Sequence, residues 1–299
     1  MSEQPSISVI IPAYRAAAIL PGAGRSLVAQ TYPRWQAIVA SDDGVDYLAV
    51  LERAGICDDR LQQVSTGACG SGEGNARNVA LAAARGAILC NLDADDEYQA
   101  DRLEQLAPLA LAHGAAVDNT GVHRPGRGVY KRPFPDARGV TPLTAEAILE
   151  PRIPLFPVFR RELAGDGWTT VRFAADVLFN LELLCAAPAM VVHPESMYLY
   201  CKRDGSITQA PDTADTAERG YAAILRLLES GALRLSKEVR AAAHAEFTAN
   251  RRVNRLFRHY MASGRCASLE DFLDITQNGR APWVEAELAR LSEEPARAA

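Results

Sequence analysis

Acidic side chains are concentrated at one point of the chain, Asp93-Ala94-Asp95-Asp96-Glu97, directly after the apolar residues 88–92. Crowded carboxylates repel one another and resist removal from water, so packing alone does not favour them at the end of a buried strand. A hard cation such as Mg²⁺ binds one or two carboxylates together with substrate phosphates, and such a cation would relieve the repulsion. The alternative is a plain loop in which Asp96 caps the following helix.

A second acidic turn and a glycine-rich stretch carry residue types that suit a nucleotide. Asp42-Asp43-Gly44 follows the apolar run 35–40, and residues 66–75 contain four glycines before a helical run that carries Arg77. A guanidinium suits phosphate or carboxylate partners. Taken alone, the first motif is equally typical of a simple turn, and Arg77 is more typical of a solvated helix surface.

The elements that must position these residues alternate between strand and helix. Apolar, β-branched runs at 7–11, 35–40 and 88–92 are separated by helical runs, and Pro12 is expected to end the first strand. This alternation predicts βαβ units in a mainly parallel sheet with flanking helices. Right-handed crossovers would bring Pro12, Asp42 and Asp93 to the same edge of that sheet, where α/β proteins bind ligands.

The second half of the chain has a looser pattern. Residues 121–138 are rich in Gly, Pro, Arg and Lys and are predicted to form a mobile basic segment, and 155–159 to form a strand. A helix over 173–185 carries Asp176 near its start, and 190–193 and 196–202 are predicted strands. From about residue 210 the pattern is helical throughout. The basic residues 124–132 are equally consistent with a solvated loop, a flap over a donor and a site for an acidic acceptor.

Composition excludes several classes of protein. The net charge of −5 and pI near 5.6 argue against non-specific nucleic-acid binding. No stretch approaches the ~20 apolar residues of a membrane span, and the N-terminal residues lack the pattern of a secretory signal. The six cysteines have neither zinc spacing nor a dense disulfide framework. We expect a cytoplasmic protein with reduced thiols, and contact with the inner face of a membrane stays open.

Together these motifs resemble glycosyltransferase family 2, whose members have the GT-A fold and use nucleotide sugars. The resemblance covers roughly two-thirds of the chain, from about Ser8 to Thr208. It rests on Val9 to Tyr14, Asp42 to Gly44, Ala76 to Asn78, Leu92 to Asp96, Phe159 to Glu162, the helix carrying Asp176, and Tyr200 to Thr208. Each segment is a weak signal alone, whereas the set in this order is strong.

The resemblance implies roles for individual residues. Asp95 would ligate Mn²⁺ or Mg²⁺ bridging the donor diphosphate, and Asp176 would be the catalytic base of an inverting displacement, with helix capping as the alternative for Asp176. Asp93 would contact the ribose. The donor-binding set implied by the resemblance is Pro12, Ala13, Tyr14, Asp42, Asp43, Arg77, Asp93, Ala94 and Arg203.

Two departures from the family pattern matter. Ala175 stands where the family often has a second acid, and Arg203 stands where a histidine can complete the metal shell. Arg203 cannot ligate a metal but suits the donor phosphates. These departures support an alternative function, a catalytically silent sugar-nucleotide-binding or scaffold subunit. A nucleotidyltransferase is disfavoured because Pro12-Ala13-Tyr14 is not the basic glycine-rich loop expected after its first strand.

The sequence therefore predicts a GT-A domain over residues 1–209, with a nucleotide-binding half at 1–118 and an acceptor and catalytic half at 119–209. A helical C-terminal region follows at 210–299 and is a candidate surface for homo-oligomer formation. The expected reaction transfers a sugar from a nucleotide-diphosphate donor, UDP-linked by preference, to a hydroxyl of a saccharide or of another small or lipid-linked acceptor.

Overall fold

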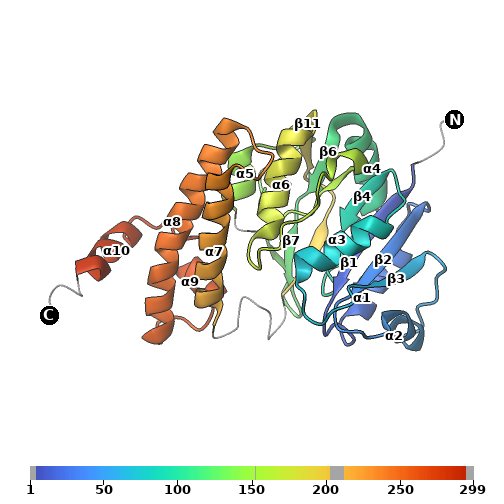
Figure 1. Cartoon of the computed structure of the whole chain (residues 1–299), viewed down its shortest axis with the longest axis horizontal. Coiled ribbons are helices and arrows are strands. Elements are labelled where there is room, and N and C mark those ends of the chain that lie inside the picture. The colour runs from blue at the N-terminus through green and yellow to red at the C-terminus, as the bar shows by residue number, and fades with distance from the viewer. Residues whose placement is uncertain (1–4, 152, 203–211, 294–299) are drawn as a thin grey trace. The chain divides into compact units, whose positions relative to one another are not determined.

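The computed structural model describes residues 5–151, 153–202 and 212–293. Contacts within the chain divide it into two compact units, one of residues 1–148 and 153–202 and one of residues 149–152 and 203–299. The first unit contains the sheets and their helices, and the second contains the long C-terminal helices (Figure 1). The domain boundaries expected from the sequence remain predictions.

The main sheet of the first unit is mixed and mainly parallel, as predicted. Its strands lie in the order β3-β2-β1-β4-β10-β6-β11-β9. Strands β1 to β4 run parallel to one another, β11 runs parallel to β6, and β10 and β9 are antiparallel to their neighbours. The bounds are β1 Ile7–Ala13, β2 Trp35–Ser41, β3 Leu61–Ser65, β4 Ile88–Asn91, β6 Gly114–Asp118, β9 Thr141–Pro142, β10 Val158–Arg160 and β11 Ala189–His193.

Helices cover this sheet because each places apolar residues on one side. In α4 the buried positions Leu103, Leu106, Ala107 and Ala110 follow helical spacing, and α4 packs on β6 and β10. Helix α3 packs on β1 and β2 and crosses in front of them in Figure 1. The helices of this unit are α1 Leu20–Val28, α2 Tyr47–Arg53, α3 Glu73–Ala83, α4 Arg102–His113, α5 Ala145–Leu149 and α6 Ala175–Ala186, with a 3₁₀ turn at Arg161–Leu163.

Strand β1 is longer than predicted, because it continues through Pro12 to Ala13. Pro12 lies opposite Ala40 of β2, whereas β4 pairs with β1 only as far as Ile10. Beyond Ile10 the β4 side of β1 has no paired residue, so the missing N–H of proline costs no ladder hydrogen bond there.

A second sheet includes the first part of the segment 121–138, which was predicted to be mobile. Its order is β5-β12-β7-β8, with β5 Glu97–Tyr98, β12 Tyr198–Cys201, β7 Gly121–Arg124 and β8 Gly128–Lys131. Strands β7 and β8 form an antiparallel hairpin, and β12 pairs parallel with β7. The prediction of a mobile basic loop at 121–138 was therefore wrong for its first part. Strands of four residues flanked by Gly and Pro are too short for their pattern to be recognised.

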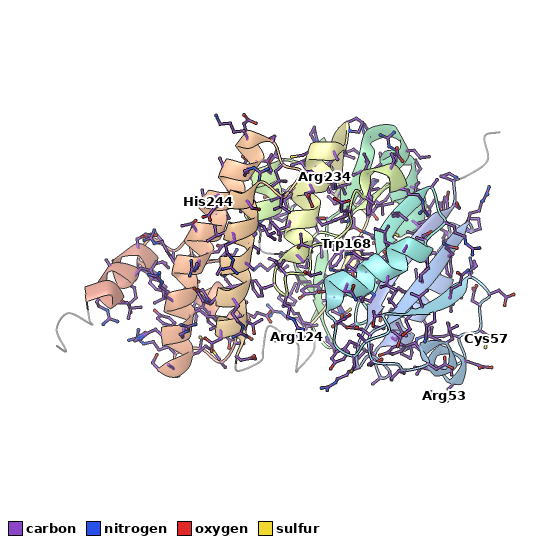
Figure 2. All side chains as sticks on the ribbon, viewed as in Figure 1. Arg53, Cys57, Arg124, Trp168, Arg234 and His244 are labelled. Atoms are coloured by element: carbon purple, nitrogen blue, oxygen red, sulfur yellow. The ribbon has the colours of Figure 1, made fainter. Side chains whose placement is uncertain are left out.

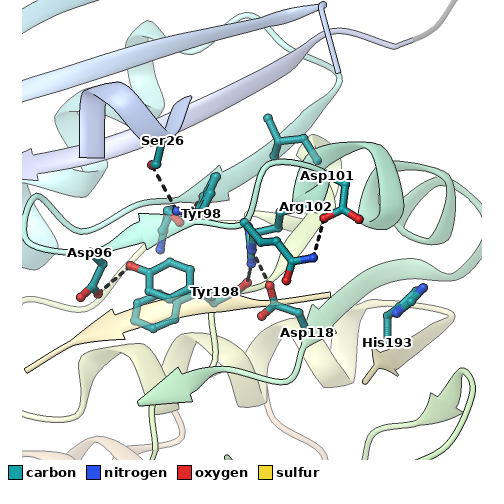
Figure 3. A network of polar contacts seen from close by, with 12 residues as sticks. Ser26, Asp96, Tyr98, Asp101, Arg102, Asp118, His193 and Tyr198 are labelled. Atoms are coloured by element: carbon teal, nitrogen blue, oxygen red, sulfur yellow. Dashed lines mark hydrogen bonds and ion pairs between the residues drawn. The ribbon is translucent and has the colours of Figure 1, made fainter. Parts of the chain in front are cut away.

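A buried ion pair joins the start of α4 to the end of β6 (Figure 3). Arg102 and Asp118 have no exposed side-chain area, and the Arg102 Nε donates to Asp118 Oδ2 at 2.5 Å. A second Arg102 nitrogen donates to the carbonyl oxygen of Phe156, and the guanidinium lies 4.3 Å from the ring centroid of Tyr98. Burial raises the pKa of the Asp118 carboxyl against the opposing charge of Arg102. Neither residue was singled out from the sequence, because nothing in their spacing marks them as partners.

Arg102→Met is expected to lower the free energy of unfolding by about 3 to 5 kcal/mol, because it leaves the Asp118 charge buried without its partner. Urea unfolding followed by circular dichroism measures the change. Arg53→Met, which removes an exposed arginine from α2, is the control and should shift stability by less than about 0.5 kcal/mol. The double change Arg102→Met with Asp118→Leu should recover part of the loss. If Arg102→Met alone is as stable as the wild type, the conclusion that Arg102 compensates the buried charge of Asp118 is wrong.

The C-terminal unit is helical over its described residues, as predicted. Helices α7 Thr213–Ser230 and α8 Lys237–Ala262 pack against each other, and α9 Leu269–Ile275 and α10 Val284–Glu293 pack on the end of α8 around Leu256, Phe257 and Phe272. Gly231 ends α7 with φ of 74°, which a glycine adopts without strain. Among the described residues, none of the helices combines the length and the apolar content required to span a bilayer.

Candidate active site

The segments that carry Pro12, Asp42 and Asp93 lie at one edge of the sheet as predicted, because they end the adjacent parallel strands β1, β2 and β4. Tyr14 follows β1, Asp42 follows β2 and Asp93 follows β4. The edge of the sheet thus brings together loops that are about 30 to 50 residues apart in the sequence.

The acidic turn after β4 is anchored to β12 by Asp96. The Tyr198 hydroxyl donates to Asp96 Oδ2 at 2.8 Å and accepts the backbone N–H of Asp93 at 3.0 Å, and the backbone N–H of Cys201 donates to Asp96 Oδ1 at 2.7 Å (Figure 3). Asp96 is fully buried. It therefore fixes the turn and does not cap the next helix, α4, whose N-cap residue is Asp101.

Arg77 lies between two acids. It is 2% exposed, and its Nη2 donates to Asp93 Oδ1 at 2.8 Å and to Glu73 one helical turn away. Burial raises the pKa of Asp93 above its usual range. Arg77 opposes that shift, and the neighbouring charges of Glu73 and Asp95 add to it. One buried cation thus serves a cluster of three carboxylates, which leaves an excess of negative charge at the end of β4.

Asp176 belongs to the same electrostatic cluster. It stands in the first turn of α6, two residues after the N-cap residue Ala174, whose φ is 54°. Burial raises the pKa of the Asp176 carboxyl, while the charge of Arg77 lowers it and that of Asp93 raises it. The structure therefore brings Asp176, Arg77 and Asp93 together from α6, α3 and the end of β4.

A clamp on α3 positions the start of α6. The amide of Asn78 donates to the Trp168 carbonyl at 2.8 Å and accepts the Trp168 backbone N–H at 2.8 Å. A side chain at Gly167, whose φ is 81°, would collide with Asn78. The Trp168 ring, labelled in Figure 2, stacks on Phe179 of α6 with 4.1 Å between centroids. In the sequence Asn78 is marked only as part of the motif Ala76 to Asn78, because its role depends on a contact between segments about 90 residues apart.

Asp42 is 3% exposed and holds the glycine-rich loop. Its carboxylate accepts from the Thr66 hydroxyl at 2.8 Å, from the Ser71 hydroxyl and N–H at 2.5 and 3.1 Å, and from the Gly72 N–H at 3.0 Å. Together these hydrogen bonds outweigh burial and lower its pKa. Asp42 thus keeps its negative charge while it fixes the loop.

Asp43 performs a similar task on the other side of the turn. It accepts from the Arg15 N–H at 2.6 Å, the Tyr47 hydroxyl at 2.8 Å and the Val45 N–H at 3.2 Å, and these bonds hold its pKa low against burial. The Tyr14 ring is 43% exposed and lies beside Gly70 of the glycine-rich loop. An exposed aromatic ring at a sheet edge offers a surface on which a base can stack.

The remaining predicted residues divide into three groups. Ala13 and Ala94 are buried and contribute backbone only, and Pro12 is part of β1. Asp95 is partly buried, and its charge acts on Asp93 and Asp96. Arg203 lies outside the described residues. Donor contact by any member of the predicted set stays a prediction.

Tyr200 of β12 lies close to the acids and was not predicted. Burial is the largest cause that raises the pKa of the Tyr200 hydroxyl. The negative charges of Asp96, Asp95, Asp93 and Asp176 raise it further. The following Lys202 places its Nζ 4.8 Å from the Tyr200 ring centroid. A tyrosine in a short strand has no sequence signal that reports its orientation towards a distant loop.

The acidic turn offers some, but not all, of the oxygen ligands that a hard cation requires. Asp93 and Asp95 supply carboxylate oxygens two positions apart in the turn, and their mutual repulsion would be relieved by Mg²⁺ or Mn²⁺. Within residues 5–151, 153–202 and 212–293, no three His, Cys, Asp or Glu residues are grouped to hold a metal by themselves. The residues therefore fit a cation whose remaining ligands come from diphosphate oxygens and water.

Comparison with known sequences finds both a family and relatives. Residues 8–173, more than half of the chain, match the model of glycosyl transferase family 2. The Rhizobium meliloti succinoglycan biosynthesis protein ExoO is 28% identical over 222 residues, which cover 69% of this chain and 63% of that protein. The Escherichia coli UDP-Glc:alpha-D-GlcNAc-diphosphoundecaprenol beta-1,3-glucosyltransferase WfgD is 34% identical over 107 residues, 35% of this chain and 41% of that protein. The chain thus spans about two-fifths to three-fifths of the length of these curated relatives.

Solved structures agree on the fold. S. aureus TarS 1-349 in complex with UDP-GlcNAc has a TM-score of 0.60 at 22% identity, covering 85% of this chain and 72% of that one. The Pyrobaculum calidifontis mannosyltransferase PcManGT, in complex with GDP-Man and Mn²⁺, has a TM-score of 0.58 at 17% identity, covering 97% and 80%. These likenesses confirm the predicted GT-A-like fold. With the family model matching over half its length, the chain belongs to glycosyltransferase family 2.

Proposed function

We propose that this protein is an inverting glycosyltransferase that uses a UDP-linked sugar and transfers it to a hydroxyl of a saccharide or lipid-linked acceptor. The observation that carries the proposal is the electrostatic cluster of Arg77, Asp93 and Asp176, drawn from α3, the end of β4 and the start of α6. Relatives whose names specify UDP-Glc or N-acetylglucosamine transfer support the choice of donor and of reaction.

Each residue has a task in this reaction. Asp176 would accept the proton of the acceptor hydroxyl while that oxygen bonds to the anomeric carbon and the nucleoside diphosphate leaves. The charge of Arg77 favours the ionised form of Asp93, which could accept a hydrogen bond from the ribose. Asp42 and Asp43 hold the loops that border the base, with Tyr14 as its stacking surface. Arg203, next to Lys202, would bind the diphosphate.

A divalent cation, Mn²⁺ or Mg²⁺, would supply charge neutralisation for the leaving diphosphate when bound. Asp95 is the residue that would hold it. A structural neighbour contains Mn²⁺ with its nucleotide sugar. The protein's own contribution is to hold the acidic turn in place through the Asp96 anchor and to set the positive charge of Arg77 against the carboxylate of Asp93.

A thermal-shift titration tests the donor. UDP-glucose, UDP-N-acetylglucosamine and GDP-mannose are added with and without Mn²⁺, and UMP is the control. A UDP-sugar is expected to stabilise the protein by about 2.7 kcal/mol at a hundredfold excess over its Kd, and more strongly with Mn²⁺ than without. Absence of stabilisation by every nucleotide sugar at millimolar concentration would contradict the proposed function.

A further inference from the structure

The β7–β8 hairpin concentrates positive charge in an otherwise acidic protein. Residues 124–132 contain Arg124, Arg127, Lys131 and Arg132 and no acid, whereas the whole chain has a net charge of −5. The three arginines are exposed and Lys131 is partly buried. Figure 2 labels Arg124 on this hairpin. A local charge of this size attracts anions over roughly 8 Å at physiological salt.

Two contacts order the hairpin. The Arg127 guanidinium lies 4.3 Å from the ring centroid of Tyr130, which holds the side chain along the hairpin. The Asn119 amide donates to the Phe134 carbonyl at 2.8 Å and accepts the Phe134 N–H at 3.0 Å, which fixes the chain where it leaves β8. The cations therefore stand on an ordered support, so that binding an anion requires little further ordering.

The second sheet links this hairpin to the acidic cluster. Tyr200 of β12 pairs with Val122 of β7, and Val122 pairs with Lys131 of β8. Directly paired residues point to the same face of a sheet, so Lys131 lies on the face that carries Tyr200. With neighbouring strands about 4.8 Å apart, Lys131 stands roughly 10 Å from Tyr200. The basic hairpin and the acidic turn thus flank one face from opposite edges.

We propose that the β7–β8 hairpin binds an anionic group, a phosphate or carboxylate, of the acceptor. This inference rests on the proposed function, since it identifies the acceptor's chemical class. A donor diphosphate held beside Asp95 would lie towards the β5 edge, because the acidic turn leads directly into β5, and three strand spacings of about 4.8 Å each separate β5 from β8. An acceptor whose hydroxyl is at Asp176 would extend across that distance and place a neighbouring charged unit on the hairpin.

Arginine side chains are suited to this task. Their planar guanidinium groups bind phosphates and carboxylates through paired hydrogen bonds. A loop that inserts into a membrane would instead expose large apolar side chains, and the apolar residues of β8, Val129 and Tyr130, are both partly buried. The hairpin also stands in register with Tyr200, which a membrane contact would not require. The observations therefore favour an acceptor over a lipid surface.

Three labelled probes test the proposal on the full-length protein, with UDP and Mn²⁺ saturating the donor site. They are a glycerol-phosphate trimer, a hyaluronan tetrasaccharide that carries carboxylates, and the neutral chitotetraose. Fluorescence anisotropy measures their affinities. At least one charged probe is expected to bind more tightly than chitotetraose and to weaken as salt is raised. The probe that binds identifies phosphate or carboxylate as the recognised group. Equal affinity for all three probes would overturn the proposal.

Paired variants assign the binding to the hairpin. The double variant Arg127→Ala with Arg132→Ala is expected to raise the Kd of the charged probe about tenfold, because two exposed charge contacts are lost. Arg53→Ala on α2 removes an exposed arginine elsewhere in the same unit and should change nothing. Unchanged probe affinity in the double variant overturns the proposal. If the double variant loses binding to phosphatidylglycerol vesicles and keeps its affinity for the charged probe, the proposal is also overturned, in favour of membrane contact.

The thermal shift caused by UDP separates this inference from the proposed function. If the double variant keeps its melting temperature and its UDP stabilisation, it is folded and its donor site is intact. A double variant that loses UDP stabilisation would show that the hairpin holds the donor, and the acceptor proposal would fall. A wild-type protein that binds the charged probe without any response to UDP would contradict the proposed function instead.

Discussion

Asp176→Asn is expected to lower the turnover number about 10²- to 10⁴-fold, the usual contribution of a general base. Asparagine keeps the shape of the side chain and cannot accept the proton of the acceptor hydroxyl. The Kd for the UDP-sugar should change by less than about threefold, because the proposed donor contacts lie on other segments. Release of UDP in the presence of acceptor measures turnover, and the thermal shift measures donor binding.

The matched control is Asp59→Asn, which changes an exposed aspartate before β3. It should leave both turnover and donor binding unchanged. Full activity in Asp176→Asn would remove Asp176 from the role of base. A wild-type protein that binds UDP-sugars and transfers none of them to a broad set of acceptors would favour the silent scaffold subunit, the alternative to which Ala175 first pointed.

The same residue sets the expected pH dependence. Burial raises the pKa of Asp176, and Arg77 only partly offsets this rise. Turnover should therefore fall as the pH drops through a pKa above the usual 3.8 of an aspartate, because the protonated carboxyl cannot accept a proton. A profile of kcat that stays flat down to pH 4 would contradict this assignment.

The sequence predicted the ends of the parallel strands better than it predicted their surroundings. Long apolar runs such as 88–92 identify buried strands, and the rule for parallel crossovers then brings Asp42 and Asp93 to one edge. Short strands such as β7 and β8 contain few apolar residues, so no periodicity marks them. Their position is decided by pairing with β12, which follows about 70 residues later.

Side-chain roles inside the site were also hidden where they depend on distant partners. The acidic run indicated a cluster of carboxylates, yet it could not show that Asp96 turns away to bind Tyr198 and Cys201. Likewise, a motif can mark Arg77, but only the fold shows that it lies between Glu73 and Asp93. Residue types thus define which chemistry is available, and tertiary contacts decide which carboxylate performs which task.

Asp95→Ala is expected to remove the Mn²⁺ dependence of UDP binding and to lower kcat/KM on the order of 10³-fold, since a bound cation contributes several kcal/mol to such reactions. Without UDP or metal, the variant should be as stable as the wild type or more stable. The reason is that Asp95 adds to the negative charge that raises the pKa values of Asp93, Asp96 and Tyr200. Thermal shifts with UDP, each measured with and without Mn²⁺, give both quantities.

Glu97→Ala is the matched control, because Glu97 is an exposed acid in the same run of acids. It should retain both the Mn²⁺ response and the activity. For Asp95→Ala we expect a lower response to Mn²⁺ together with an equal or higher stability in the absence of ligands. This combination distinguishes a binding residue from a structural one, since loss of a structural carboxylate would lower stability in every condition. If Asp95→Ala still responds to Mn²⁺ as the wild type does, the cation is held elsewhere. The repulsion at the end of β4 would then need another explanation.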